Sequence, residues 1–207
     1  GDVSSSQELL ILFAVFSMLI ATFSALIQKK VKRFVAYSSV GHVGYLLIGL
    51  CCFTLEGVQS LFLYLMVYLI TSLSVWCFVL TVRSVYFTEL SGLSRKNPIL
   101  SLSFAISLFS IAGVPPLAGF CAKAFVFFSA IESSLYSVAF IGVLTSVISA
   151  FYYIRIIKVL YFDHPNVSKG GRFEIFSIGR ERSIVLAIAQ LVIVLLVAYP
   201  NLLIAIS

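Results

Sequence analysis

The chain has 207 residues, of which 61% are hydrophobic and 11% are charged, and its mean hydropathy is +1.11. Soluble globular domains carry about 25% charged residues, so this composition excludes that class and indicates a polytopic membrane protein. The net charge is +6, but the basic residues lie between the apolar segments, which is a pattern typical of membrane topology. No nucleic-acid partner is expected.

Six apolar segments are expected to cross the bilayer, whose hydrocarbon core of about 30 Å needs about 20 apolar residues. The last of them is short and stops before Pro200. They predict an all-α polytopic membrane helix bundle that forms a single membrane domain over residues 1–207. The expected spans are Leu9–Ile27, Phe34–Phe53, Leu61–Val82, Ile99–Ile131, Tyr136–Tyr161 and Ser183–Ala198. Residues 163–182 are polar, mix both charge signs and contain proline and glycine, which predicts a surface loop.

The second span carries three polar residues on one helical face. Ser38, His42 and Tyr45 are spaced at i, i+4 and i+7. Neutral imidazole has both a hydrogen-bond donor and an acceptor, so a histidine with hydroxyl neighbours can pass a proton. The same pattern also fits a histidine that is simply hydrogen-bonded between packed helices, with glycines at 41 and 44 allowing close approach. The spacing alone favours this packing interpretation.

The fourth apolar segment, Ile99–Ile131, is too long for one straight helix. Gly113, Pro115, Pro116 and Gly119 interrupt it. Each proline removes a backbone donor and clashes with the preceding turn. The segment therefore predicts a discontinuous helix, with two half-helices joined by unwound backbone near residues 113–116.

Lys123 follows this interruption inside the same apolar segment. A charged side chain at the bilayer centre costs about 2.5–3.5 kcal/mol on insertion scales. The long lysine stem could carry the ammonium to an interface, but residues 124–128 continue apolar beyond it. Lysine, unlike arginine, can exchange a proton when its surroundings change. We therefore interpret Lys123 as a proton carrier in a transport pathway.

The remaining basic residues indicate the orientation of the chain. Thirteen of the 14 lie in or beside the first, third and fifth connections, at 29–33, 83–96 and 155–182. The opposite side carries only acidic residues, namely Asp2, Glu8, Glu56 and Glu132. The positive-inside rule then places the odd-numbered connections in the cytoplasm or an organelle matrix, and both termini across the membrane.

The sequence contains no pattern that would bind a cofactor or metal. Its four cysteines, Cys51, Cys52, Cys77 and Cys121, form no C-x-x-C pair, so they are interpreted as small apolar residues in packed helices. A glycine-rich phosphate loop, an H-E-x-x-H motif and a nucleophile elbow are all missing. We expect neither a metal site nor hydrolase chemistry in this chain.

Three stretches resemble a known family. They are VKRFVAYSSVGHVGY at 31–45, SIAGVPPLAGFCAK at 110–123 and IGVLTSVISAFYYIR at 141–155. All three are similar to the subunit 2 family of respiratory NADH:ubiquinone oxidoreductase, complex I. The resemblance implies an antiporter-like fold with two inverted repeats, each containing a broken helix. This chain would hold the second repeat plus one extra helix, and Lys123 falls on the lysine of that family's broken helix.

The resemblance also implies a function. The chain would contribute part of a proton-translocation pathway coupled to NADH oxidation and ubiquinone reduction, with Lys123, His42, Tyr45 and Ser38 in that pathway. It would be a non-redox subunit, with NADH, FMN, iron–sulfur clusters and ubiquinone bound elsewhere in the complex. Two alternatives stay open, a structural membrane subunit with an inactive pathway and a cation/proton antiporter subunit.

Partners and location follow from the same resemblance. The chain starts at Gly1 without a methionine, and the first repeat is missing. We expect a separate polypeptide with the upstream helices, as from a split mitochondrial gene, together with other membrane-arm subunits and lipids. The expected site is the mitochondrial inner membrane, crossed several times, with both termini facing the intermembrane space. A bacterial plasma membrane is the alternative.

Overall fold

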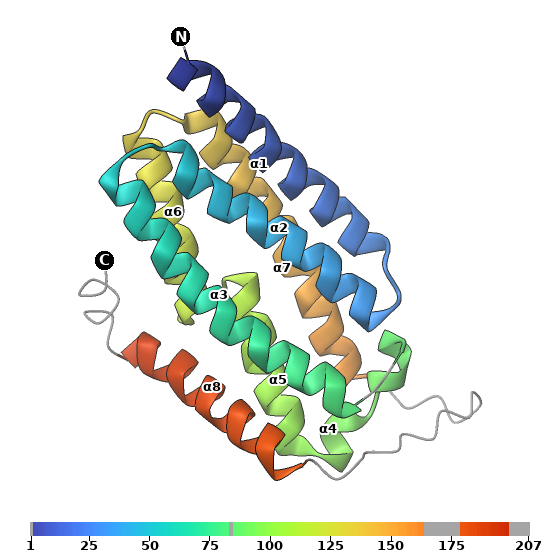
Figure 1. Cartoon of the computed structure of the whole chain (residues 1–207). Coiled ribbons are helices and arrows are strands. Elements are labelled where there is room, and N and C mark those ends of the chain that lie inside the picture. The colour runs from blue at the N-terminus through green and yellow to red at the C-terminus, as the bar shows by residue number, and fades with distance from the viewer. Residues whose placement is uncertain (1, 83–84, 164–178, 199–207) are drawn as a thin grey trace.

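The computed structural model describes residues 2–82, 85–163 and 179–198 (Figure 1). Within these ranges the helices are α1 (Asp2–Ile27), α2 (Val31–Cys51), α3 (Leu55–Val82), the short 3-10 helix η1 (Phe87–Leu90), α4 (Leu93–Lys96), α5 (Pro98–Ala112), α6 (Ala118–Glu132), α7 (Tyr136–Tyr161) and α8 (Arg180–Ala198). The described residues contain no strand beyond one isolated bridge between Lys30 and Tyr86. The all-α class predicted from the sequence is confirmed.

Four helices are long and apolar enough to cross a membrane by length and composition, as far as the described ranges extend. They are Ser5–Ile27 of α1, together with α2, α3 and α7. Helices α5 and α6 have 15 residues each, which is about 22 Å of helix and less than the hydrocarbon thickness. Neither half-helix therefore spans a bilayer alone, and the two together occupy the fourth expected segment.

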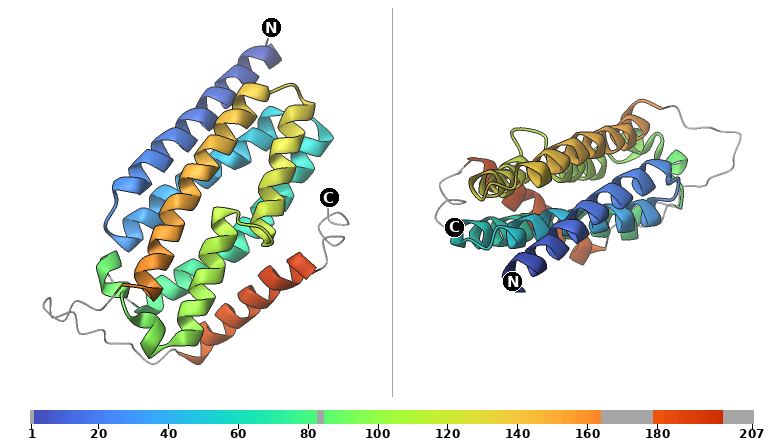
Figure 2. Two further views of the ribbon diagram at one scale, coloured as in Figure 1. Left: turned by 180° about the vertical axis from the view of Figure 1, so that it is seen from behind. Right: turned by 90° about the horizontal axis from the view of Figure 1, so that it is seen from above.

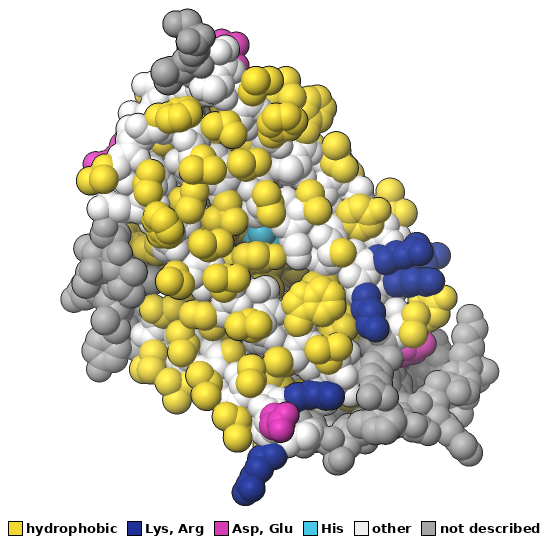
Figure 3. All heavy atoms as spheres, viewed as in Figure 1, with side chains coloured by type: hydrophobic (Ala, Val, Ile, Leu, Met, Phe, Trp, Pro, Cys, Tyr) yellow, Lys and Arg dark blue, Asp and Glu magenta, His cyan; other side chains and the backbone are white. Residues whose placement is uncertain are grey.

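The helices pack as a bundle whose chain direction alternates. Figure 2 shows α5, α6 and α7 in one layer and α1, α2 and α3 in the other, with α8 alongside α3 and α5. The connections at 28–30, 85–97 and the end of α7 meet at one end of the bundle, and the N-terminus lies at the other (Figure 1). On the face seen in Figure 3, a broad hydrophobic surface ends in lysine and arginine side chains near those connections.

The interruption expected near residues 113–116 is present. Helix α5 ends at Ala112, and Gly113 has a φ of +80°, a left-handed conformation that L side chains rarely adopt. The Gly113 amide donates to the carbonyls of Phe109 and Ser110, which closes the helix end. The next peptide bonds include a cis Pro115–Pro116 bond, and α6 begins at Ala118.

Gly119 lets the start of α6 lie directly against the end of α5. A Cβ atom at this position would sit 2.7 Å from the carbonyl carbon of Ser110 and still closer to its oxygen. Real Cβ atoms essentially never make contacts that short. Only glycine therefore permits this approach of the two half-helices.

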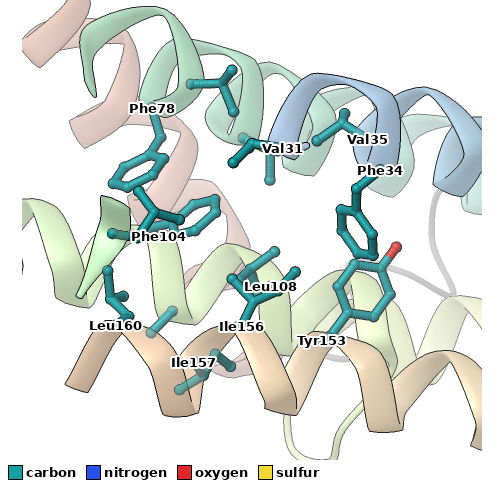
Figure 4. Close-up of a cluster of buried hydrophobic side chains, with 14 of the residues drawn as sticks. Val31, Phe34, Val35, Phe78, Phe104, Leu108, Tyr153, Ile156, Ile157 and Leu160 are labelled. Carbon is teal, nitrogen blue, oxygen red and sulfur yellow. The ribbon is translucent and has the colours of Figure 1, made fainter. Parts of the chain in front are cut away.

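Two hydrophobic clusters hold the layers together. The larger one joins α2, α3, α5 and α7 (Figure 4). In it the rings of Phe78 and Phe104 stack with centroids 3.7 Å apart, and Phe34 meets Tyr153 edge-on at 5.6 Å. The second cluster lies toward the other end of the bundle and centres on buried alanines of α6 and α1, including Ala14, Ala118 and Ala122.

A buried polar network attaches α8 to the bundle. The amide nitrogen of Gln190 donates to Ser74 on α3 at 2.8 Å and to Ser107 on α5 at 2.7 Å, and it also lies 3.0 Å from the carbonyl oxygen of Ser103. The hydroxyls of Ser74 and Ser107 bond to each other at 2.7 Å. Because unpaired polar groups are expensive in an apolar interior, this network fixes α8 against both helices.

Some helices extend past the expected spans. Helix α1 begins at Asp2 rather than Leu9, α3 begins at Leu55 rather than Leu61, and α8 begins at Arg180 inside the segment expected to be a loop. A helix satisfies its own backbone hydrogen bonds, so it can continue beyond the apolar residues that the hydropathy pattern detects. The rest of that expected loop, 164–178, lies outside the described residues.

Candidate functional site

Lys123 is buried in the bundle, with 5% of its side chain exposed. It lies on the second turn of α6, and its ammonium donates a hydrogen bond of 3.1 Å to the carbonyl of Ala112, the last residue of α5. The unpaired carbonyls at a helix C-terminus carry partial negative charge and attract cations. The break in the fourth segment therefore supplies the acceptor for a lysine inside the bundle.

The face of Tyr45 provides a second contact for the ammonium. The Lys123 nitrogen lies 5.1 Å from the centre of the Tyr45 ring, which is within the range of a cation–π interaction. The Tyr45 hydroxyl points elsewhere and bonds to the Thr145 hydroxyl on α7 at 3.2 Å. In the described part of the chain no carboxylate forms an ion pair with Lys123, so a carbonyl and an aromatic ring surround this charge.

His42 connects three helices from the middle of α2. It is 5% exposed. Its Nδ1 shares a hydrogen bond of 2.6 Å with the Tyr64 hydroxyl on α3, and its Nε2 lies 3.4 Å from the Tyr153 hydroxyl on α7. The Tyr153 hydroxyl also bonds to Ser38, one turn earlier on α2. Both imidazole nitrogens therefore have hydroxyl partners, as a group that passes protons requires.

A small cavity lies between Lys123 and His42. Its volume is about 10 Å³, and both side chains line it together with Thr71, Ser110 and Gly119. The Ser110 hydroxyl is fully buried and has no hydrogen-bond partner among the described residues. A space of about 10–15 Å³ is what one water molecule needs. The cavity thus has the size and the polar lining to hold a single water between the lysine and the histidine.

The structure brings the sequence-predicted residues into one buried region. Ser38 and His42 share Tyr153, while Tyr45 contacts Lys123 through its ring. Gly113 lies against the lysine stem, since a Cβ there would be 3.0 Å from the Lys123 Cδ. Gly119 lines the cavity. The two prolines of the break, Pro115 and Pro116, are exposed and take no part in these contacts.

Sequence reasoning missed the partners that other helices contribute. They are Tyr64, Thr145 and Tyr153, which form hydrogen bonds with the predicted residues, and Ser110, which lines the cavity. Each lies on a different helix from the predicted residue that it faces, and helical spacing relates only residues on one helix. The available signal was tyrosine in the interior of apolar segments, because a buried phenolic hydroxyl usually requires a hydrogen-bond partner.

Comparison with known proteins places these features in context. Residues 3–149 match the family described as NADH:quinone oxidoreductase/Mrp antiporter, transmembrane. The chain is 44% identical over 199 residues to NADH-ubiquinone oxidoreductase chain 2 of Marchantia polymorpha, an alignment that covers 94% of this chain and 40% of that protein. It is 46% identical over 162 residues to NADH-quinone oxidoreductase subunit N of Rhodospirillum rubrum, covering 76% of this chain and 33% of the relative.

The fold is also similar to a solved structure. A chain of respiratory complex I from Thermus thermophilus with bound Aureothin superposes with a TM-score of 0.80 at 30% identity, over 97% of this chain and 45% of that one. The present chain thus spans about 40% of the length of the Marchantia relative and less than half of the Thermus chain.

Proposed function

Since the chain belongs to the NADH:quinone oxidoreductase/Mrp antiporter family of transmembrane proteins, we propose that it contributes part of a proton-translocation pathway to the membrane arm of a respiratory NADH:ubiquinone oxidoreductase. The observation that carries this proposal is the bond from Lys123 to the broken helix end, beside a cavity shared with His42. Relatives named as NADH-ubiquinone and NADH-quinone oxidoreductase subunits support the assignment to such a complex.

The residues suggest a route for the proton. A proton released by the Lys123 ammonium would pass to one water in the small cavity and on to the Tyr64 hydroxyl, which also lines the cavity and would give its own proton to Nδ1 of His42. The imidazole would release a proton from its other nitrogen to a tyrosine hydroxyl, so its net charge is restored. The Tyr153 and Ser38 hydroxyls extend the route toward the start of α2, where the basic connections lie. In this pathway Tyr45 would act by holding the lysine with its ring.

The break between the half-helices supplies a way to control the lysine. The ammonium is attracted by the carbonyl end of α5, whereas a neutral amine would lose most of that attraction. Any change in the distance between α5 and Lys123 would therefore alter how readily the lysine holds its proton. The energy would come from NADH oxidation and ubiquinone reduction in other subunits, which would also bind the FMN and iron–sulfur clusters.

Two further proposals concern the partners and the location of the chain. The relatives are longer, so we propose that a separate polypeptide supplies the upstream helices and that further membrane-arm subunits surround the chain. Helix α1 exposes apolar side chains, which supports contact with such helices or with lipid. They include Phe13, Phe16, Ile20 and Phe23. We place the chain in the mitochondrial inner membrane, with both termini facing the intermembrane space, because the basic connections gather at the other end.

The decisive experiment replaces Lys123 by methionine in the assembled complex and measures protons transported per NADH oxidised. We expect transport per NADH to fall while the complex still assembles. The matched control is Lys32→Met, which removes the same charge from an exposed position on α2. Normal assembly with unchanged proton transport in Lys123→Met would reject the pathway and favour a structural subunit. Sodium-dependent exchange without NADH oxidation would instead favour the antiporter alternative.

The separate upstream polypeptide has its own test. Mass spectrometry of the native complex, run on a gel stained for NADH dehydrogenase activity, should find this chain in the active band together with a second chain that bears the upstream helices. A single longer polypeptide in that band would reject a divided subunit.

A further inference from the structure

A second cavity lies far from Lys123, at the end of the bundle where the basic connections meet. Its volume is about 450 Å³, within the range of pockets that hold small ligands. It forms between the end of α1, the start of α2, the η1 segment and the last turns of α7. The cavity is separate from the proton route described above. It is not lined by Ser38, His42, Lys123 or Tyr153.

The inner wall of this cavity is apolar and consists of buried, packed side chains. Phe34, Tyr152 and Ala25 line it and are buried. The Phe34 ring packs edge-on against Tyr152 at 5.2 Å and against Phe87, another lining residue, at 5.3 Å. Such a surface offers nothing to a hydrated inorganic ion, but it can pack against the glycerol and the first methylenes of a lipid chain.

The rim of the cavity is cationic. Among the described residues Lys29, Arg155 and Lys158 line it and are exposed, and Asp163 is the one acidic residue of that lining, so these residues give the rim a formal charge of three minus one, or +2. Arg155 and Lys158 are three residues apart on α7 and therefore share one helical face. Within the described ranges no ion pair is present for any of the three cations. Their charge is available to an anion.

We propose that this cavity binds the phosphate group of an anionic phospholipid, with the phosphate on the rim and the glycerol against the aromatic wall. Basic pockets between transmembrane helices on the cytoplasmic or matrix side are suited to anionic head groups. A guanidinium can contact two phosphate oxygens at once, and lysines add point charges. The combination of a cationic rim and an apolar wall at one end of a membrane bundle selects an amphipathic phosphate ester.

The test uses the complete complex in nanodiscs of phosphatidylcholine that contain a small fraction of phosphatidylglycerol. Native mass spectrometry counts the phosphatidylglycerol that stays bound. The variant Arg155→Gln/Lys158→Gln removes two rim charges, and each cation near an anionic lipid contributes about 5-fold in affinity, so binding should weaken roughly 25-fold. The control Lys32→Gln/Arg33→Gln removes the same charge from exposed positions at the same end of the bundle that do not line the cavity. It should retain the lipid.

A single change, Lys29→Gln, covers the case in which the double variant fails to assemble, and it should weaken binding about 5-fold. Inorganic phosphate is added as a separate arm. Displacement of bound phosphatidylglycerol only by other anionic lipids supports the lipid assignment, while displacement by millimolar inorganic phosphate assigns the site to soluble phosphate. Equal lipid retention by both double variants overturns the proposal. Protons transported per NADH are measured in parallel, so this outcome is independent of the Lys123 result.

Discussion

Replacing Gly119 by alanine tests whether the close approach of the half-helices matters for function. The added methyl group would lie 2.7 Å from the carbonyl carbon of Ser110, and the backbone has to move because the two closest atoms are the Ser110 carbonyl carbon and oxygen. Carbon atoms prefer separations of about 3.5 Å or more. The start of α6 must therefore move away from α5 by at least about 0.8 Å, because the methyl group would lie even closer to the Ser110 carbonyl oxygen.

That displacement is large enough to affect the lysine. The bond from Lys123 to the Ala112 carbonyl is 3.1 Å long, and a rigid shift of α6 along that bond by the same amount would lengthen it to at least about 3.9 Å, which is no longer a hydrogen bond. Overpacking of this kind costs about 1–3 kcal/mol of stability. We expect reduced proton transport per NADH together with a lower level of assembled complex.

The matched control is Gly41→Ala on α2. Its added methyl would lie 3.3 Å from the Cβ of Ala21, so a shift of a few tenths of an ångström suffices. Alanine gains about 1 kcal/mol of helix propensity over glycine in a helix interior, which applies in full to position 41 and less at position 119 in the first turn of α6. A loss well beyond that difference in Gly119→Ala reports the clash. Assembly is measured on native gels, and proton transport is measured in proteoliposomes with NADH as donor. If Gly119→Ala matched Gly41→Ala in both assays, the distance between the half-helices would be irrelevant to pumping.

Three further predictions use other contacts. Tyr153→Phe removes the hydroxyl that meets His42 while keeping the ring, so proton transport should fall with normal assembly, and unchanged transport would remove this tyrosine from the route. Gln190→Leu removes the amide hydrogen bonds to Ser74 and Ser107, which keep their bond to each other, and should lower the stability of the complex by about 1–3 kcal/mol, with transport per NADH intact. A hydrogen bond to Glu56 and the charge of that carboxylate raise the pKa of Glu132 at the exposed end of α6. Because the pKa of Glu132 is higher in the folded state, folding takes up a proton. This stabilises the folded state at low pH, and the stabilisation is lost as the pH rises through the folded-state pKa. Glu132→Gln should therefore flatten the pH dependence of the melting temperature, measured in melting curves at a series of pH values.

The sequence predicts those parts of the molecule that depend on local chain chemistry. Gly113 and the two prolines indicate the broken helix, because they act on the backbone where they stand. The apolar segments indicate the helices, since hydropathy is summed along the chain. The helix ends are less well predicted, as the start of α8 at Arg180 illustrates. Charged residues can belong to a helix while lying outside its apolar part.

The sequence predicts only some of the contacts in the candidate site. Spacing on α2 correctly groups Ser38 with His42, and both reach the same hydroxyl. It does not reveal that this hydroxyl belongs to Tyr153, which is 111 residues away from His42 in sequence. Nor does it reveal the small cavity lined by Ser110, because a cavity is a property of how helices pack and not of any one helix.

The attachment points of the two half-helices have a mechanical consequence. Helix α5 is pinned near its middle, where Ser107 bonds to Gln190. Helix α6 is pinned near its far end, where Ser129 bonds to Ser60 at 3.1 Å. Residues 113–117 and the first turns of α6 lie between these two fixed points. Any bend of the fourth segment between these two points would stretch the contact between Lys123 and the Ala112 carbonyl.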